Sequence, residues 1–175
     1  VFCTTGNTWQ SFFISYIYLL CGCENCFDPT TVIDYSGYQE GGRGTITLQT
    51  YSQVIDRITG KSSSKSYVLT SSGAVNLLMR ATKSDTTWCE VDGKVSLIYD
   101  AKVPSCVQTF MNRTHGTSGA IVVSNGTFKV GGTATFKNVP SVTVCDGATF
   151  LYDSTQLAGL SGVTRVTVGN GGTFK

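Results

Sequence analysis

Apolar and polar residues alternate in short runs along most of the chain. Residues 142–144 and 166–168 both read Val-Thr-Val, and residues 45–51 alternate with Ile46 and Leu48 on one face. Such period-two alternation is typical of β-strands with one buried face. Residues 74–81 are the best helix candidate, but their apolar residues also alternate, which favours a strand. The pattern therefore predicts an all-β protein.

The last third of the chain repeats itself. Residues 123–128, 144–150 and 168–174 share a Val, a Gly and a closing Thr-Phe, and their central glycines are 21 and then 24 residues apart. A period in the twenties is typical of a solenoid in which each copy is one coil. The rival is a meander of hairpins, because Asn-Gly and Asp-Gly between apolar runs also predict hairpin turns. The regular period favours the coil.

Each copy contains the parts of a β-coil. A Val-rich strand is followed by Asn-Gly or Asp-Gly, residue types that adopt positive φ at low cost in a tight turn, and Thr-Phe then begins a second strand. We expect Phe128, Phe150 and Phe174 to stack as an internal column. The residues expected to be buried are Val144, Val168, Phe150 and Phe174, and those expected to be exposed are Thr143 and Thr167.

In their Val-x-x-Gly-Gly-Thr phrases, residues 119–175 resemble the passenger regions of bacterial autotransporter-type adhesins and related secreted β-solenoids. The resemblance implies a secreted or surface-displayed all-β protein, and it brings no catalytic residues. In its low charge and surplus cysteine, though in no motif, the chain is also similar to prokaryotic sheath, surface-layer or extracellular-filament subunits.

The sequence predicts two further regions before the repeats. Residues 1–27 form an aromatic, cysteine-rich segment, and residues 28–118 an antiparallel β-sandwich-like region that leads into the solenoid-like repeats of residues 119–175. A hairpin is expected around Asp92-Gly93 because the runs on either side of this turn signal are both apolar.

Residues 9–20 form an apolar, aromatic run that is too short to span a membrane, which takes about 20 residues. Their Phe, Ile and Tyr content favours a buried strand. The core of a residual signal peptide is the alternative.

Charge and cysteine content bear on the compartment. Charged residues make up 14% of the chain, the formal net charge is +2, and no basic cluster is present to bind nucleic acid. Seven cysteines predict export, since disulfides persist outside the reducing cytosol. Sequons at Asn112 and Asn125 would permit N-glycosylation. We expect a secreted or cell-surface protein from which a signal peptide has been removed.

The sharpest cluster of candidate site residues is Cys21-x-Cys23-x-x-Cys26. Thiolates at this spacing can bind a tetrahedral metal ion, with Cys3 as a fourth ligand. Export and the lack of a second paired-cysteine motif favour disulfides instead, so we expect neither metal nor cofactor. Because seven is odd, at least one thiol stays unpaired or bonds between chains. The disulfide candidates are Cys3, Cys21, Cys23, Cys26, Cys89, Cys106 and Cys145.

Few residues suggest catalysis. His115, the only histidine, is expected in an exposed loop and simply solvated, although a Ser-His-Asp or Cys-His mechanism would have to use it. Asp146 and Asp153 could act on carbohydrate as a carboxylate pair, but Asp146 is better explained as the turn residue before Gly147. The segment Gly41-Gly-Arg-Gly44 lacks the Lys and the helix of a phosphate-binding loop. The sequence therefore predicts no enzyme.

The functional hypothesis is an extracellular structural subunit that self-assembles through β-edges into a filament, sheath or surface layer. The last repeat has no polar cap, and the aromatic run near the N-terminus of another copy could cover it. The alternatives are a fragment of a longer adhesin, or a cell-surface adhesin or glycan-binding module with exposed aromatics. The glycan-stacking candidates are Tyr35, Tyr38, Tyr51 and Trp88. The expected assembly edge comprises Phe12, Phe13, Ile14, Tyr16, Ile17, Val166, Val168 and Phe174.

Overall fold

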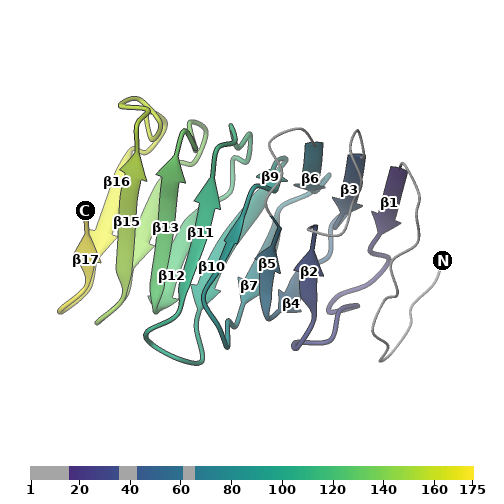
Figure 1. Cartoon of the computed structure of the whole chain (residues 1–175), viewed down its shortest axis with the longest axis horizontal. Coiled ribbons are helices and arrows are strands. Elements are labelled where there is room, and N and C mark those ends of the chain that lie inside the picture. Colours follow the sequence, from purple (N-terminus) through teal and green to yellow (C-terminus); the bar gives the residue numbers. More distant parts are fainter. Residues whose placement is uncertain (1–15, 36–42, 61–65) are drawn as a thin grey trace.

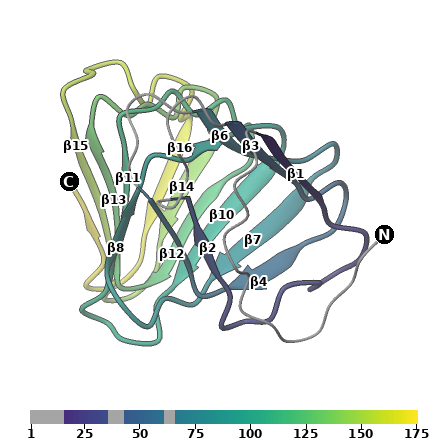
Figure 2. The same ribbon diagram turned by 45° about the vertical axis from the view of Figure 1, so that its right-hand side comes forward.

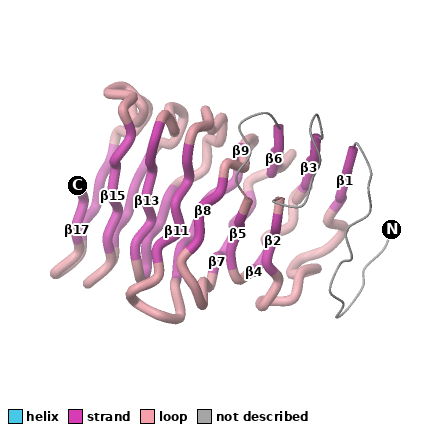
Figure 3. Tube along the Cα trace, in the orientation of Figure 1, coloured by secondary structure: helices cyan, strands magenta, loops and turns pink. Residues whose placement is uncertain are grey.

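The chain winds into a parallel β-solenoid in the computed structural model, which describes residues 16–35, 43–60 and 66–175 (Figure 1). Every strand pairing in these residues is parallel. Figure 3 shows strands and loops, and no helix, in the described part of the chain. The all-β prediction and the predicted coil are therefore confirmed, and the hairpin meander is wrong.

One face of the solenoid, called here the long face, is a six-stranded sheet with one strand from each coil. Paired residues of successive strands are 24, 20, 24, 21 and 24 positions apart, so one coil takes 20–24 residues. Its strands are β4 (Gln53–Ile55), β7 (Val75–Met79), β10 (Val95–Asp100), β12 (Ile121–Asn125), β14 (Ser141–Val144) and β16 (Arg165–Val168).

The second face is called here the Phe face. A five-stranded sheet forms most of it, and the bridge Gly60–Thr87 joins it to a two-stranded sheet nearer the N-terminus. The five strands are β8 (Asp85–Thr87), β11 (Val107–Met111), β13 (Thr127–Gly132), β15 (Thr149–Ser154) and β17 (Thr173–Phe174), and the two are β2 (Val32–Asp34) and β5 (Arg57–Thr59).

The third face is a four-stranded sheet in the N-terminal half and loops in the C-terminal half. Its strands are β1 (Tyr16–Leu20), β3 (Arg43–Thr47), β6 (Ser66–Thr70) and β9 (Glu90–Val91). In later coils, backbone bonds between loops replace the ladder, as from His115 N to Thr135 O at 2.8 Å and from Phe136 N to Gly159 O at 2.7 Å. Figure 2 shows the three faces around a common interior.

The interior is filled by columns of like residues because parallel register places equivalent side chains one above another. The inward residues of the long face that are fully buried are Leu77, Leu97, Ile121 and Val142 in one column, and Ile55, Met79, Tyr99, Val123 and Val144 in the next. Val95 and other β-branched residues suit this environment, since their stiff side chains pack well on a pleated surface.

An aromatic column runs along the Phe face. Ring centroids lie 5.1 Å apart between Phe110 and Phe128, 5.8 Å between Phe128 and Phe150, and 5.1 Å between Phe150 and Phe174. The predicted stack is therefore confirmed, and Phe110 extends it. Phe150 is fully buried, whereas Phe174, in the edge strand β17, is 37% exposed.

The corner between the two long sheets requires glycine. Gly126 has φ +82°, and a Cβ there would lie 2.8 Å from the Ala101 Cβ and 2.9 Å from the Cys106 oxygen. Gly147, at the next coil, has φ +72° but faces open space. The Asn-Gly and Asp-Gly signals thus mark corners between sheets.

The predicted antiparallel sandwich of residues 28–118 is wrong. This region is built of the same parallel coils, and the long face runs without interruption from β4 across the predicted boundary at residue 118 to β16. Asp92-Gly93 is likewise no hairpin, because β9 and β10 on either side of it belong to different sheets. A turn signal between two apolar runs fits both a hairpin and a coil corner, and only long-range pairing separates them.

Candidate functional site

The edge of β16 and β17 is the most exposed apolar feature that coincides with a predicted site. Val166, Val168 and Phe174 are 45%, 44% and 37% exposed, although their counterparts one coil earlier, Val142, Val144 and Phe150, are fully buried. The expected burial of Val168 and Phe174 is thus wrong, while that of Val144 and Phe150 is confirmed. The cause is position, since these two strands are the edges of their sheets.

The backbone of this edge is also available for pairing. Gly169 N donates to Val144 O at 2.7 Å. Because alternate N–H groups of a parallel strand point to opposite sides, the N–H of Val168 points away from β14. Thr167 is exposed as expected, while Thr143 is half-buried between neighbouring strands. A strand added here would find both hydrogen-bonding groups and apolar side chains.

The N-terminal part of the predicted assembly edge lies at the other end of the molecule (Figure 1). Tyr16 and Ile17 belong to β1, which pairs with β3 through Tyr16–Arg43 and Ile17–Gly44. The predicted strand is confirmed for residues 16–20, but its predicted burial is wrong at Leu20, which is 48% exposed. Phe12, Phe13 and Ile14 lie outside the described residues. Within one chain, Tyr16 and Ile17 therefore do not meet β16 and β17.

The outer surface of the long face carries an apolar stripe that no sequence motif marks. We define the apolar stripe as Val54, Leu78, Ile98 and Val122, which follow one another in register on β4, β7, β10 and β12 and are all half-buried. Beside the stripe, Arg80 Nε lies 3.9 Å from Asp100 Oδ2, and both side chains are more than 40% exposed. The alternation within each strand indicates that one of these residues faces outward, but only the register shows that the four residues are neighbours.

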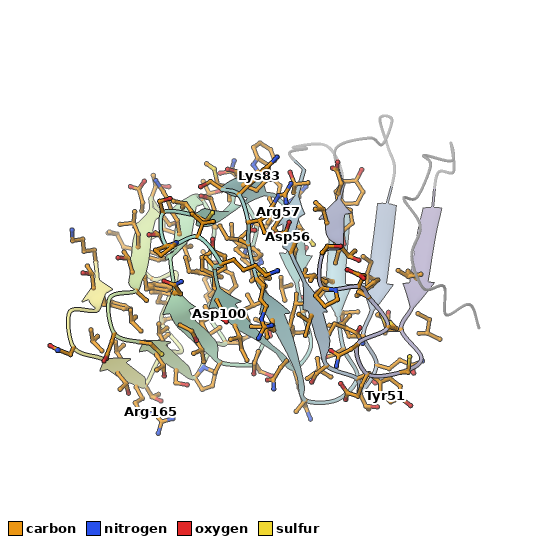
Figure 4. The ribbon with its side chains drawn as sticks, turned by 90° about the horizontal axis from the view of Figure 1, so that it is seen from below. Tyr51, Asp56, Arg57, Lys83, Asp100 and Arg165 are labelled. Atoms are coloured by element: carbon orange, nitrogen blue, oxygen red, sulfur yellow. The ribbon has the colours of Figure 1, made fainter. Side chains whose placement is uncertain are left out.

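A second polar cluster ties the first coils together. Arg57 lies between two carboxylates, with Nη1 at 2.6 Å from Asp56 and Nε at 3.1 Å from Asp85. Asp56 also accepts bonds from Thr82 N at 2.8 Å and Thr82 Oγ1 at 2.9 Å, and Asp85 accepts one from Thr59 Oγ1 at 2.7 Å. Figure 4 shows Asp56 and Arg57 side by side, far from Arg165. These polar atoms are occupied by one another, so the cluster is a link between coils.

A shallow depression of about 270 Å³ adjoins this cluster. It is lined by Ser84, Asp85, Thr86, Val107 and Thr109 on the Phe face. The carboxylate that faces it is already bound by Arg57 and Thr59. The depression therefore offers no convergent set of available polar groups.

His115 is buried, so its prediction as a solvated loop residue is wrong. Its ring stacks on Phe136 at 4.0 Å, and Nδ1 accepts a bond from Val91 N at 3.2 Å. Burial, and secondarily the charge of Arg113, lowers the pKa of His115 to about 3. An imidazole that stays neutral and faces no solvent acts as an aromatic core residue that accepts one hydrogen bond from a backbone N–H.

The six described cysteines carry no disulfide bond in the structure, and Cys3 lies outside the described residues. Cys21 is buried beside Cys26, and burial together with this contact raises the pKa of Cys21 far above its usual value. Burial likewise raises the pKa of Cys89 to about 12. Disulfide formation at these residues stays a prediction. The other described cysteines are Cys23, Cys106 and Cys145.

The two acids considered for carbohydrate chemistry have structural partners. Asp146 Oδ1 accepts a bond from Asn170 N at 2.8 Å, in the next coil. Asp153 Oδ2 lies 2.7 Å from Lys129 Nζ. Asp146 is thus a turn residue that links two coils, as its place before Gly147 suggested.

The glycan-stacking candidates do not form a common surface in the described residues. Tyr35 is buried and stacks on Tyr67 at 4.6 Å, so its ring is a core residue. Tyr51 and Trp88 are half-buried in different coils. Tyr38, Gly41 and Gly42 lie outside the described residues, whereas Arg43 and Gly44 belong to β3.

Both sequon asparagines are half-buried and hydrogen-bonded. Asn125 Nδ2 donates to Ala101 O at 2.6 Å, and Asn112 Oδ1 accepts a bond from Thr133 N at 3.0 Å. Each side chain thus joins its coil to an adjacent one.

Residues 16–35, 43–60 and 66–175 contain no group of three or more His, Cys, Asp or Glu side chains arranged to hold a metal ion. Within the same ranges, the structure has no helix long and apolar enough to cross a membrane. No family model, curated protein or solved structure matches the chain.

Proposed function

We propose that this chain is an extracellular structural subunit that self-assembles by pairing the β16–β17 edge with a strand of a second copy. The observation that carries the proposal is the exposure of Val166, Val168 and Phe174, whose counterparts one coil earlier are buried. A paired strand would remove this apolar surface from water at about 25 cal/mol per Å². It would also satisfy the outward backbone groups, the mode by which strands add to open sheet edges.

The polar groups support a structural role. Carboxylates that could serve catalysis are bound across coils by Arg57, Lys129 and backbone amides. Charged residues are only 14% of the chain, which weakens the repulsion between copies. Seven cysteines support export and covalent locking of an assembly.

The test compares assembly of the parent with an edge variant. Val168→Pro removes a donor on the free side of β16 and leaves the bonds from β16 to β14 in place. We expect the parent to form filaments or sheets by electron microscopy, and the variant to stay monomeric by light scattering at the same concentration.

Leu157→Lys is the matched control, because Leu157 is fully exposed in the loop between β15 and β16 and belongs to neither edge strand. If this control abolishes assembly as well as Val168→Pro does, nonspecific apolar contact explains the association. If the parent is monomeric at high concentration, the proposal is wrong.

A further inference from the structure

The apolar stripe on the long face is symmetric about the line between β7 and β10. Leu78 and Ile98 lie on either side of this line, and Val54 and Val122 lie one strand further out. Along the solenoid axis, the stripe therefore has a valine at each end and two larger residues, Leu78 and Ile98, between them. A copy turned end for end therefore presents the same order, so that residues of similar size lie opposite one another.

The adjacent charges have the same symmetry with opposite signs. Arg80 follows β7 and Asp100 closes β10, at the same level along the strands. The flank on the other side of the stripe is small and uncharged, with Asn76 and Ser96 at equivalent positions. A half-turn about an axis along the strands, placed between β7 and β10, exchanges the Arg80 and Asp100 positions.

We propose that the long face is a self-association surface on which a second copy packs face to face with its coils running in the opposite direction. Leu78 then meets Ile98 of the second copy, Val54 meets its Val122, and Arg80 meets its Asp100. The two ion pairs become a ring of four alternating charges. Both sheets keep aligned strands, as face-to-face sheets do at a spacing of about 10 Å.

The other face-to-face arrangement is disfavoured by charge. In this arrangement the second copy is rotated by half a turn about an axis parallel to the solenoid axis. Its Arg80 and Asp100 would then lie at the opposite end of the strands from Arg80 and Asp100 of the first copy. Each pair would then face Asn76 and Ser96, which are uncharged. Lys94, the nearest charged residue on this flank, would match Asp100 but leave Arg80 without an opposite charge. Charge complementarity thus selects the antiparallel arrangement.

The contact is small, so it acts as a lateral contact between larger assemblies. Four strands about 4.8 Å apart, each with about five residues at 3.3 Å, overlap over about 300 Å² per copy. A standard interface buries about 800 Å² per partner. A single pair of copies should associate weakly, and repetition along a filament multiplies the contact. The surface itself does not rest on the proposed edge pairing.

The experiment uses the full chain with Val168→Pro, so that edge pairing does not contribute. Sedimentation velocity at increasing concentration is expected to show a weak dimer. Arg80→Asp and Asp100→Arg, introduced singly, each place like charges across the axis and should weaken dimerisation at least tenfold. An equimolar mixture of the two variants restores opposite charges at every contact and should dimerise at least as well as the parent.

Recovery in the mixture is the decisive outcome, because damage to the fold of either variant would not be repaired by mixing. Ile98→Lys should abolish the dimer, whereas Thr143→Lys, one strand beyond the stripe, should leave it unchanged. A monomeric parent, or a mixture no more associated than its components, would overturn this proposal without bearing on the edge pairing.

Discussion

The aromatic column makes a quantitative prediction at Phe150. Its ring is fully buried between Phe128 at 5.8 Å and Phe174 at 5.1 Å. Replacing a buried Phe by Ala typically costs about 3–5 kcal/mol in unfolding free energy. Each lost stacking contact contributes about 0.5–1.5 kcal/mol beyond burial. Because two stacking contacts are lost, we expect Phe150→Ala to lower the unfolding free energy by an amount in the upper part of the range for Phe→Ala, about 4–5 kcal/mol.

Phe174→Ala is the matched control, because this ring is 37% exposed and stacks on one neighbour in the chain. It should cost no more than about 2 kcal/mol, roughly the cost of a partly exposed side chain and one stack. Urea denaturation followed by circular dichroism measures both values under conditions where each variant is monomeric. Equal losses for the two variants, or a loss under about 1 kcal/mol at Phe150, would refute the column as a source of stability.

Two further predictions concern single residues. Because burial lowers the pKa of His115 to about 3, below its ordinary 6.5, the unfolded chain binds the proton more readily, and stability should fall by about 1.4 kcal/mol per pH unit as pH drops from about 6.5 toward 3. Comparison of the urea midpoints of the parent and His115→Phe across this range checks it, and parallel pH profiles would contradict it. Gly126→Ala should cost more than Gly147→Ala, since both demand positive φ but only the first adds contacts at 2.8 and 2.9 Å. Equal thermal unfolding shifts for the two glycine variants would show that backbone strain alone decides the cost.

The sequence predicted the coil where the chain repeats and misjudged it where it does not. Val123, Val144 and Val168 recur with the same turn after them, so their shared column could be inferred. In residues 28–118 the same coil is built from Met79 and Tyr99, which have no common motif. Their equivalence is visible only from the register, and alternation alone fits an antiparallel sandwich equally well.

The candidate sites divide in the same way. The sequence assigned Val168 and Phe174 to the assembly edge but also predicted that they are buried, and only the structure shows that they are exposed. The burial of His115 could not be predicted, since its environment comes from Phe136, a coil away, and from Val91 before it. Likewise Arg80 and Asp100 are 20 residues apart in sequence, and only the coil length makes them neighbours.

The coil length also determines how the molecule should respond to a mechanical load. Each strand ladder joins one coil to the next, so the described part of the chain has no ladder contact between its two ends. Pulling along the axis should therefore peel coils one at a time, as expected for a one-dimensional array. Each coil of 20–24 residues would release about 70–85 Å of extended chain. Because the coils unfold one at a time, such a subunit would extend under tension before its covalent backbone is stretched.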